Sequence, residues 1–171
     1  TVQVPRFWNP SAYSENGVRD FLGFNGKYLI SQEEARAIGS FMESKETIFV
    51  AVASYRDPEC LTTVEDIFLR AKYPERIRVA IVDRRTEGDP ICSKPVESCE
   101  QNPEQVLCKY GHLIDSTEYP AQLMVGPVFA RHLAYRMYRG EYFAMQVDSH
   151  VRFVANWDED IIDQWKSTGN E

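Results

Sequence analysis

Three stretches of the chain have the pattern of strands that are covered on both faces. Residues 46–54 (ETIFVAVAS), 76–84 (RIRVAIVDR) and 142–148 (YFAMQVD) are largely apolar at consecutive positions and rich in β-branched or aromatic residues. Runs of this kind are typical of buried strands in a parallel sheet, where helices cover both faces. Residues 112–117 (HLIDST) are a candidate for a further short strand.

Helices are predicted between these strands. Thr62 and Glu65 have the spacing of a capping box, and apolar residues then recur at helical spacing. Residues 126–140 (GPVFARHLAYRMYRG) hold Pro127 at the first turn of a second predicted helix. Asn156 is the expected N-cap of a last helix, with acidic residues in its first turn. This alternation predicts an α/β sandwich with a largely parallel central sheet.

The first 45 residues lack this alternation. Residues 1–30 mix Pro, Asn, Gly and aromatic residues without a period, so an irregular lead-in is expected. Three aromatic side chains are expected to pack it: Phe7, Trp8 and Phe21. Residues 31–44 (SQEEARAIGSFMES) open with another capping box and predict a short helix. The chain is therefore divided into a lead-in over residues 1–45 and an α/β region over residues 46–171.

Composition narrows the class of partner. The 171 residues, 43% of them hydrophobic, are enough for one domain with a sizeable core. The net charge is −7, and nucleic acids are bound through surfaces rich in Lys and Arg, so a nucleic-acid partner is not expected. No apolar run approaches the roughly 20 residues of a membrane span. No signal-peptide pattern opens the chain, and an anchor upstream of Thr1 stays open.

The cysteines leave the cellular compartment open. Cys92, Cys99 and Cys108 lie in one polar loop, with six and then eight residues between them, which is not the C-x-x-C spacing of zinc sites. One disulfide in this loop is expected if the protein enters an oxidising compartment such as the Golgi or secretory lumen. Free thiols are expected if the protein is cytoplasmic.

Two of the predicted strands end in polar residues, and ligands of parallel sheets bind beyond the carboxyl ends of the strands. The end of the first strand carries four candidate binding residues: Ser54, Tyr55, Arg56 and Asp57. The third ends in Asp148, Ser149 and His150. Because residues i and i+2 of an extended chain point to one side, Asp148 and His150 are expected to converge on a cation while Ser149 points away. A carboxylate and an imidazole suit Mn²⁺, and Mg²⁺ less well.

The same residues allow plainer roles, and the sequence leaves both interpretations open. The D-x-H pattern is common by chance, so Asp148 could cap a turn and His150 could be a histidine at the rim of the sheet. Arg56 and Asp57 could stabilise a turn. Arg131 lies one turn into a predicted helix, where it is either a solvated cation or a group that reaches a diphosphate.

Three ordered blocks of the sequence resemble a known family. They are ASYRDPEC at residues 53–60, GPxxAR at 126–131 and YxGEYFxxQxDSHxRFxxxWD at 138–158. Together they resemble the N-terminal half of glycosyltransferase family 60, the UDP-GlcNAc-dependent polypeptide N-acetylglucosaminyltransferases. The resemblance implies a GT-A fold with a D-x-H variant of the D-x-D metal motif. Since the catalytic domains of that family continue further, the chain is expected to be the donor-binding part of an incomplete domain, with little activity alone.

The resemblance also implies roles for individual residues. Asp148 and His150 would bind Mn²⁺ or Mg²⁺, which bridges the phosphates of a UDP-sugar, and Asp148 would also lie at the donor. Further donor-binding residues would be Ser54, Tyr55, Arg56, Asp57 and Arg131. The implied reaction transfers N-acetylglucosamine or a related sugar to a protein or peptide hydroxyl with retention. The sequence offers no clear nucleophilic carboxylate, so same-face attack by the acceptor is the hypothesis.

Other classes of protein could share such a sheet. A nucleotide-sugar pyrophosphorylase-like enzyme would usually carry a Gly-rich phosphate loop, and none follows the first predicted strand. A non-catalytic nucleotide-binding or interaction module would keep the core and lose the metal. A flavodoxin-like or response-regulator domain would place acids at strand ends but would not need His150.

Overall fold

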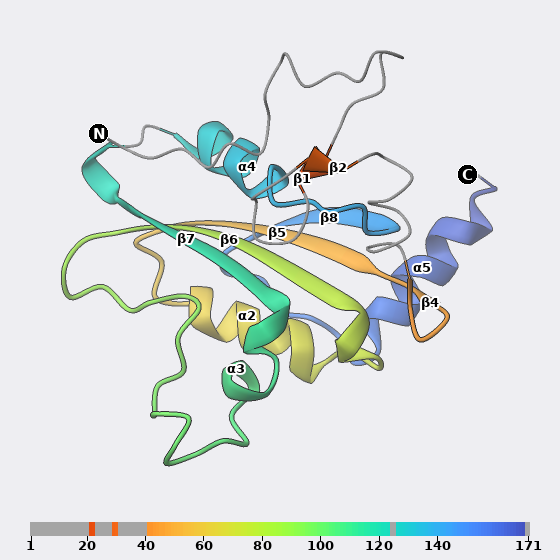
Figure 1. Cartoon of the computed structure of the whole chain (residues 1–171), viewed down its shortest axis with the longest axis horizontal. Helices are drawn as coiled ribbons and strands as arrows, with labels where there is room; N and C mark the ends of the chain where they lie inside the picture. Colours follow the sequence, from red (N-terminus) through yellow and green to blue (C-terminus); the bar gives the residue numbers. More distant parts are fainter. Residues whose placement is uncertain (1–20, 23–28, 31–40, 124–125, 170–171) are drawn as a thin grey trace.

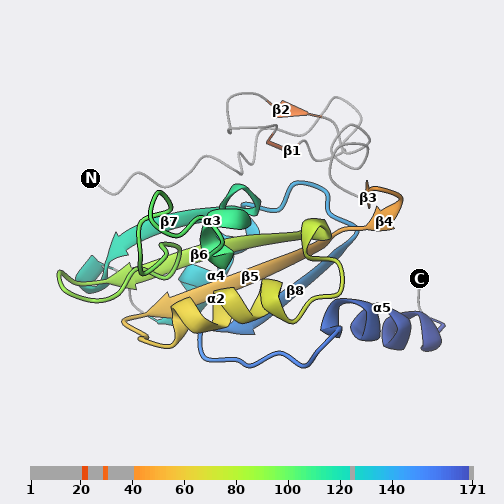
Figure 2. The same ribbon diagram turned by 90° about the horizontal axis from the view of Figure 1, so that it is seen from below.

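In the computed structural model of the chain, four parallel strands form the central sheet in the order β7-β6-β5-β8 (Figures 1 and 2). The strands are β5 (Ile48–Tyr55), β6 (Ile77–Arg85), β7 (Ile114–Pro120) and β8 (Phe143–Asp148). Each neighbouring pair runs parallel, so the predicted parallel sheet is confirmed. The structure describes residues 21–22, 29–30, 41–123 and 126–169.

Helices cover both faces of the sheet. Figure 1 shows α4 on the opposite side of the sheet from α2 and α3. The α-helices are α2 (Cys60–Leu69), α3 (Val106–Lys109), α4 (Pro127–Tyr135) and α5 (Trp157–Ser167). Short 3₁₀ helices are η2 (Pro74–Arg76), η3 (Gly111–Leu113) and η4 (Ala121–Leu123). Two small antiparallel pairs precede the sheet: β1 (Phe21–Leu22) with β2 (Leu29–Ile30), and β3 (Phe41–Met42) with β4 (Lys45–Glu46).

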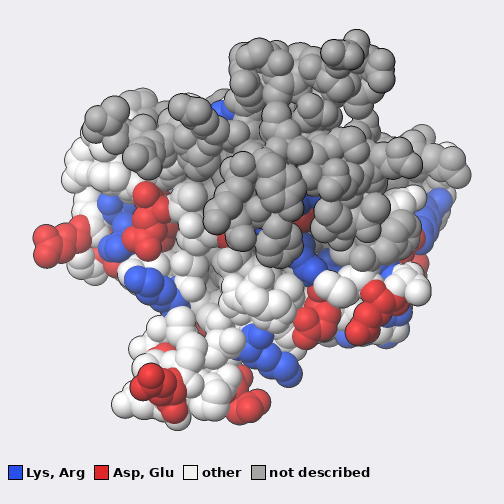
Figure 3. Space-filling model, in the orientation of Figure 1, with Lys and Arg blue, Asp and Glu red and all other residues white. Residues whose placement is uncertain are grey.

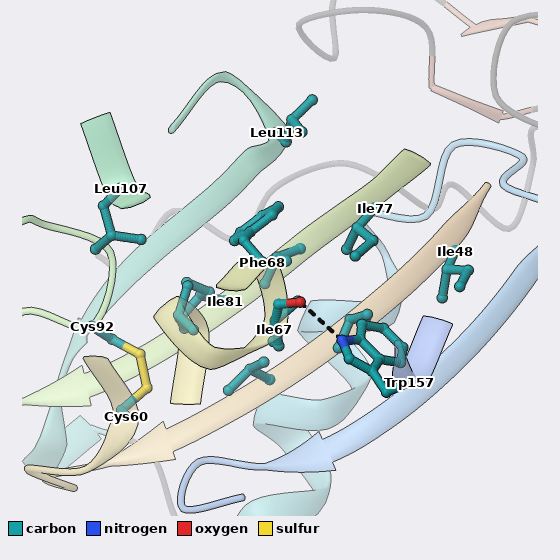
Figure 4. Close-up of a cluster of buried hydrophobic side chains, with 14 of the residues drawn as sticks. Ile48, Cys60, Ile67, Phe68, Ile77, Ile81, Cys92, Leu107, Leu113 and Trp157 are labelled. Carbon is teal, nitrogen blue, oxygen red and sulfur yellow. Dashed lines mark hydrogen bonds between the residues drawn. A yellow bond between two sulfur atoms is a disulfide. The ribbon is translucent and has the colours of Figure 1, made fainter. Parts of the chain in front are cut away.

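The central strands are apolar on both faces because each face meets a different layer of helices. Alternate residues of β5 face opposite ways, so Val50 packs in the cluster of α2 and α5 while Phe49 packs in the cluster of α4. Figure 4 shows the first cluster, in which Trp157 Nε1 donates a hydrogen bond to the Ile67 carbonyl at 2.9 Å. Burying one such aliphatic side chain contributes roughly 1.5–3 kcal/mol. These two clusters therefore hold the strand ends in fixed positions.

All four cysteines are paired. Cys60 at the start of α2 is bonded to Cys92 in the loop after β6, and Cys99 is bonded to Cys108. Figure 4 shows the Cys60–Cys92 bridge at one end of the hydrophobic cluster. The sequence suggested at most one disulfide, confined to the loop. The pairing of Cys60 was not predicted, because only the folding of the β5-α2-β6 unit brings Cys60 close to Cys92.

Three predicted elements differ from the observed ones. Residues 142–148 were expected to form a buried strand, but β8 is paired with β5 alone among the described strands, and its residues alternate between half-buried and exposed. The helix predicted from Thr62 begins at Cys60, because the Asp57 carboxylate accepts a hydrogen bond from Glu59 N at 2.9 Å and starts the turn earlier. Helix α4 ends at Tyr135 rather than near Gly140.

The predictions for the lead-in are mostly not tested. Phe7, Trp8 and residues 31–40 lie outside the described residues. The end of the predicted helix is wrong, because Phe41–Met42 is strand β3, which pairs with β4 across a turn at residues 43–44. At the other end of the chain, Asn156 does precede α5, although its side chain makes no capping hydrogen bond.

Charged residues of both signs are interspersed on the face drawn in Figure 3. Exposed ion pairs such as Arg85–Glu118 and Lys166–Glu46 join elements across the surface. Pairs of this kind each contribute about 0–1 kcal/mol, so the apolar clusters carry most of the stability. Within the described ranges, no helix has the length and apolar character needed to cross a membrane.

Candidate functional site

The carboxyl ends of β5 and β8 lie side by side. The two strands are paired in parallel, and the register sets Ala53 opposite Asp148. The polar residues that follow each strand therefore emerge at the same edge of the sheet, as ligand sites in α/β proteins require. The two groups of candidate residues predicted from the sequence are thus brought together.

Asp57 joins the two groups. Arg56, the residue before it, has φ 51°, in the left-handed region that few non-glycine residues adopt, and this turns the chain out of β5. One oxygen of the Asp57 carboxylate, Oδ2, accepts a hydrogen bond from Ser149 Oγ at 2.6 Å and lies 2.8 Å from His150 Nδ1. The other oxygen, Oδ1, accepts from Glu59 N. The residue after β5 thus holds the D-S-H tripeptide after β8.

The Asp57–His150 contact shifts both groups toward their charged forms. Burial raises the pKa of the Asp57 carboxyl, but hydrogen bonds from Ser149, His150 and Glu59 N outweigh burial, so this pKa lies below its ordinary value. The hydrogen bond to Asp57 and the negative charge of Asp57 raise the pKa of His150. The pair therefore favours a negative carboxylate beside a proton on Nδ1.

Helix α2 also holds the backbone of the tripeptide. The Thr63 hydroxyl is buried and donates a hydrogen bond to the Ser149 carbonyl at 2.9 Å. The Thr63 hydroxyl oxygen also accepts a hydrogen bond from Val151 N at 3.0 Å. Two polar backbone groups of this turn are thereby satisfied by one side chain, which fixes the path of the chain through His150.

Asp148 and His150 contact different partners. The β-strand ends at Asp148, and Ser149 and His150 form a turn, so the side chains no longer alternate as in an extended chain. Arg131 of α4 donates a hydrogen bond from Nη2 to Asp148 Oδ1 at 2.8 Å. Ser149 was expected to point away from His150, but both contact the same oxygen of Asp57. The Asp148 and His150 side chains are 57% and 62% exposed.

The other candidates at the end of β5 have distinct surroundings. Ser54 is buried, and its carbonyl accepts a hydrogen bond from Arg84 Nε at 3.0 Å. The Arg84 guanidinium lies 5.0 Å from the centre of the exposed Tyr55 ring. Arg56 donates two hydrogen bonds to the carboxylate of Asp89, at 2.9 and 3.2 Å. The Arg56 guanidinium and the Thr86 N–H hold the pKa of the Asp89 carboxyl well below its usual range.

Several residues of this edge were not singled out from the sequence. Arg84 lies at the carboxyl end of β6, and the rule that drew attention to the other two strand ends would also have found it. Its Nη1 donates a hydrogen bond to the Gly126 carbonyl at the start of α4. Thr63 gives no sequence signal, because a threonine inside a helix is made important only by the loop that packs on it. Asp89 is likewise recognised only through its contact with Arg56.

The donor atoms at this edge fit part of a cation site. A carboxylate and an imidazole lie at the end of one strand, both well exposed, and the Nδ1 of the ring already faces a carboxylate. Metal-binding histidines commonly make this second contact. Among the described residues, no cluster of three or more His, Cys, Asp or Glu side chains could hold a metal. Asp148 and His150 thus supply at most two protein ligands from this region, and metal binding stays a prediction.

A hollow of about 430 Å³ lies along the same edge, beyond the carboxyl ends of β6 and β7. It is lined by Arg85, Thr86, Glu87, Glu118, Tyr119, Pro120 and Gln122. The hollow is therefore on the far side of β6 from the D-S-H turn, and none of the predicted binding residues lines it.

Comparison with solved structures supports the fold. The structure is similar to the crystal structure of S. aureus TarS 1-349, with a TM-score of 0.50 and 18% sequence identity. The match covers 71% of this chain and 32% of the TarS chain, so it spans about a third of that chain's length. At this identity the likeness concerns the fold, and it confirms the predicted α/β fold class. No curated protein matches the sequence.

The sequence also matches a family model. The model described as Glycosyltransferase (GlcNAc) matches residues 47–110 and 94–171, which together cover more than half of the chain. Both blocks of candidate residues, at the ends of β5 and β8, fall inside the match. The chain therefore belongs to the GlcNAc glycosyltransferase family.

Proposed function

We propose that this chain binds a UDP-sugar at the carboxyl edge of its sheet and serves the transfer of N-acetylglucosamine, or a related sugar, to a protein hydroxyl. The observation that supports this most is the network at that edge, where Asp57 contacts Ser149 and His150. A glycosyltransferase that uses a nucleotide sugar must bind a diphosphate, and ligands of parallel sheets bind beyond the carboxyl ends of the strands. The resemblance to family 60 supports UDP-GlcNAc as donor and a polypeptide as acceptor.

Asp148 and His150 are the proposed ligands of a divalent cation, Mn²⁺ or Mg²⁺. A bound divalent cation would offset the negative charge that develops on the leaving diphosphate. Asp148 would contribute a carboxylate oxygen and His150 the ring nitrogen that Asp57 does not contact. Because the cation supplies positive charge locally, a chain of net charge −7 can still bind a nucleotide at this edge.

Arginine side chains are proposed to receive the rest of the donor. Arg131 lies against Asp148, and Arg56 and Arg84 flank the end of β5. Guanidinium groups suit phosphate oxygens because they can donate two parallel hydrogen bonds. The exposed Tyr55 ring offers a flat apolar face to the uridine. We assign no catalytic nucleophile, and same-face attack by the acceptor hydroxyl, with retention, stays the hypothesis for the transfer step.

Titration of UDP into the chain by calorimetry, with and without Mn²⁺, tests the donor site. Asp148→Ala and His150→Ala are each expected to weaken Mn²⁺-dependent UDP binding at least tenfold, as losing a metal ligand or its support typically does. His112→Ala is the matched control, because His112 is equally exposed but lies at the amino end of β7. It is expected to bind UDP like the unaltered chain.

Two results would contradict the proposal in different ways. UDP binding that needs no Mn²⁺ and survives both substitutions would favour a non-catalytic nucleotide-binding module on the same fold. Absence of UDP binding in any condition would overturn the donor site in this chain. Covalent sugar trapped on the protein during turnover would overturn same-face attack and keep the donor site. The donor sugar itself follows from comparing hydrolysis of UDP-GlcNAc with that of UDP-glucose and UDP-GalNAc.

A further inference from the structure

The Asp57 carboxylate has its hydrogen bonds filled from three directions. Oδ2 contacts Ser149 Oγ and His150 Nδ1, and Oδ1 accepts from Glu59 N. These donors come from two separate parts of the chain, the turn before α2 and the turn after β8. A carboxylate engaged by three donors acts as a fixed acceptor.

This arrangement decides which nitrogen of His150 carries the proton. An ionised carboxylate only accepts hydrogen bonds, so Nδ1 at 2.8 Å from Oδ2 must be the N–H side of the ring. In the neutral imidazole, the lone pair is then on Nε2. The ring is 62% exposed, and Nε2 has no hydrogen bond within the part of the chain that is described. Nε2 is therefore the nitrogen offered to a ligand.

We propose that Asp57 is a positioning residue for His150, which holds the ring in its Nδ1–H form and aims Nε2 at the cation. The cation part of this inference rests on the function proposed above, whereas the ring form and the hydrogen bond do not. Asp57 itself is not assigned as a metal ligand, because its oxygens are already engaged. The block ASYRDPEC therefore orients the histidine of the D-S-H block through the carboxylate of Asp57.

Neighbouring side chains have other partners than the His150 ring, so the role of Asp57 can be tested by itself. Arg131 contacts Asp148, and Arg152 lies 3.6 Å from Glu59, so neither sets the ring. Thr63 holds backbone groups of the turn. Ser149 donates to the same oxygen of Asp57, but it contacts neither nitrogen of the ring. The ring form should therefore depend on the Asp57 carboxylate, and removing the Arg152 guanidinium should leave it unchanged.

Two measurements test the inference. The first is ¹H–¹⁵N correlation of the histidine ring nitrogens without metal, at a pH where His150 is neutral. The chain has only three histidines, so the spectrum is simple and His150→Gln assigns the signal. The unaltered chain should show His150 as the Nδ1–H form. Asp57→Asn should shift it toward the Nε2–H form, because the Asn amide can present a donor instead of an acceptor.

The second measurement is the Mn²⁺ requirement of UDP binding in the same variants. Asp57→Asn should raise the Mn²⁺ dissociation constant about 10–100-fold, the usual effect of removing the partner of a ligating histidine. Arg152→Gln, at an exposed residue that pairs with Glu59, is the matched control and should keep the ring form and most of the Mn²⁺ affinity. Asp57→Glu keeps a carboxylate and should retain the Nδ1–H form, with an affinity between those of the unaltered chain and Asp57→Asn.

The outcomes separate this inference from the proposed function. An Nε2–H form in the unaltered chain would overturn it without any variant, even if Asp57→Asn fails to fold. An unchanged ring form and Mn²⁺ affinity in folded Asp57→Asn would overturn it as well. If the unaltered chain shows the Nδ1–H form but binds no Mn²⁺, the proposed cation site is wrong, while the hydrogen bond between Asp57 and His150 is supported.

Discussion

Asp158 at the amino end of the sheet and Asp148 at the carboxyl end are both paired with an arginine, yet their surroundings differ. The Asp158 side chain is 0% exposed and accepts hydrogen bonds from the Arg76 side chain and from the backbone N–H groups of Lys72 and Tyr73. Asp148 accepts one hydrogen bond from Arg131 and is 57% exposed.

The difference shows how one type of ion pair serves two purposes. At the amino end, Asp158 ties α5 to the start of β6, and every contact is with the protein itself. At the carboxyl end, the carboxylate and the nearby imidazole keep solvent-facing atoms that a ligand can reach. A buried pair is costly to break, whereas an exposed pair can exchange partners at little cost. The first pair therefore belongs to the fold, and the second is suited to binding.

The largest expected effect comes from breaking the buried pair. Asp158→Ala leaves the Arg76 guanidinium buried without its carboxylate, which should lower the free energy of unfolding by about 3–5 kcal/mol. Asp160→Ala, an exposed acid in the same helical turn, is the control and should change it by less than about 0.5 kcal/mol. Urea denaturation measures both. If Asp158→Ala lowered the free energy of unfolding only as much as Asp160→Ala, the buried pair would not be the structural contact described here.

Local patterns in the sequence were sufficient to predict most of the sheet and to predict that the polar residues after β5 and β8 lie at one edge. The apolar runs of β5 and β6 reflect burial on both faces, and polar residues after β5 and β8 meet because parallel strands end at one edge. The contacts that matter most were not predictable in this way. Asp158 looked like one of several acids in the first turn of a helix, and only its contacts with the segment between α2 and β6 show that it is buried and paired.

Which side chains contact one another within the site could not be predicted from the sequence either. Alternation along a strand predicted that Ser149 points away from His150, but the rule stops where the strand stops, at Asp148. Asp57 was predicted to bind the donor, and this stays a prediction, but its contacts with Ser149 and His150 were not predicted. Contacts between side chains of separate elements depend on how those elements pack, and residue spacing along the chain does not predict them.

The next effect concerns the covalent tie at the carboxyl end. The Cys60–Cys92 bridge closes a loop with a sequence separation of 32, and Cys99–Cys108 one of 9. Replacing both Cys60 and Cys92 with alanine should lower the free energy of unfolding by about 2–4 kcal/mol, and replacing the second pair should cost roughly 1 kcal/mol less, since the shorter loop restricts the unfolded chain less. Denaturation of the two double variants gives the order. The reverse order would mean that loop length does not govern these bridges.

The smallest expected effect is the pH dependence of the exposed Arg56–Asp89 pair, which sharpens the contrast with Asp158. Arg56 holds the pKa of Asp89 below its unfolded value of about 3.9, so the folded state binds this proton less readily than the unfolded state. The pair therefore adds stability above about pH 4, and the contribution is lost as pH falls through the folded pKa. Carboxyl carbon NMR should show Asp89 titrating below the usual range, and Arg56→Gln should return it toward that range. An ordinary Asp89 pKa in the unaltered chain would show that the exposed pair does not persist in solution. The end of β5 would then present Arg56 to a ligand without a competing carboxylate.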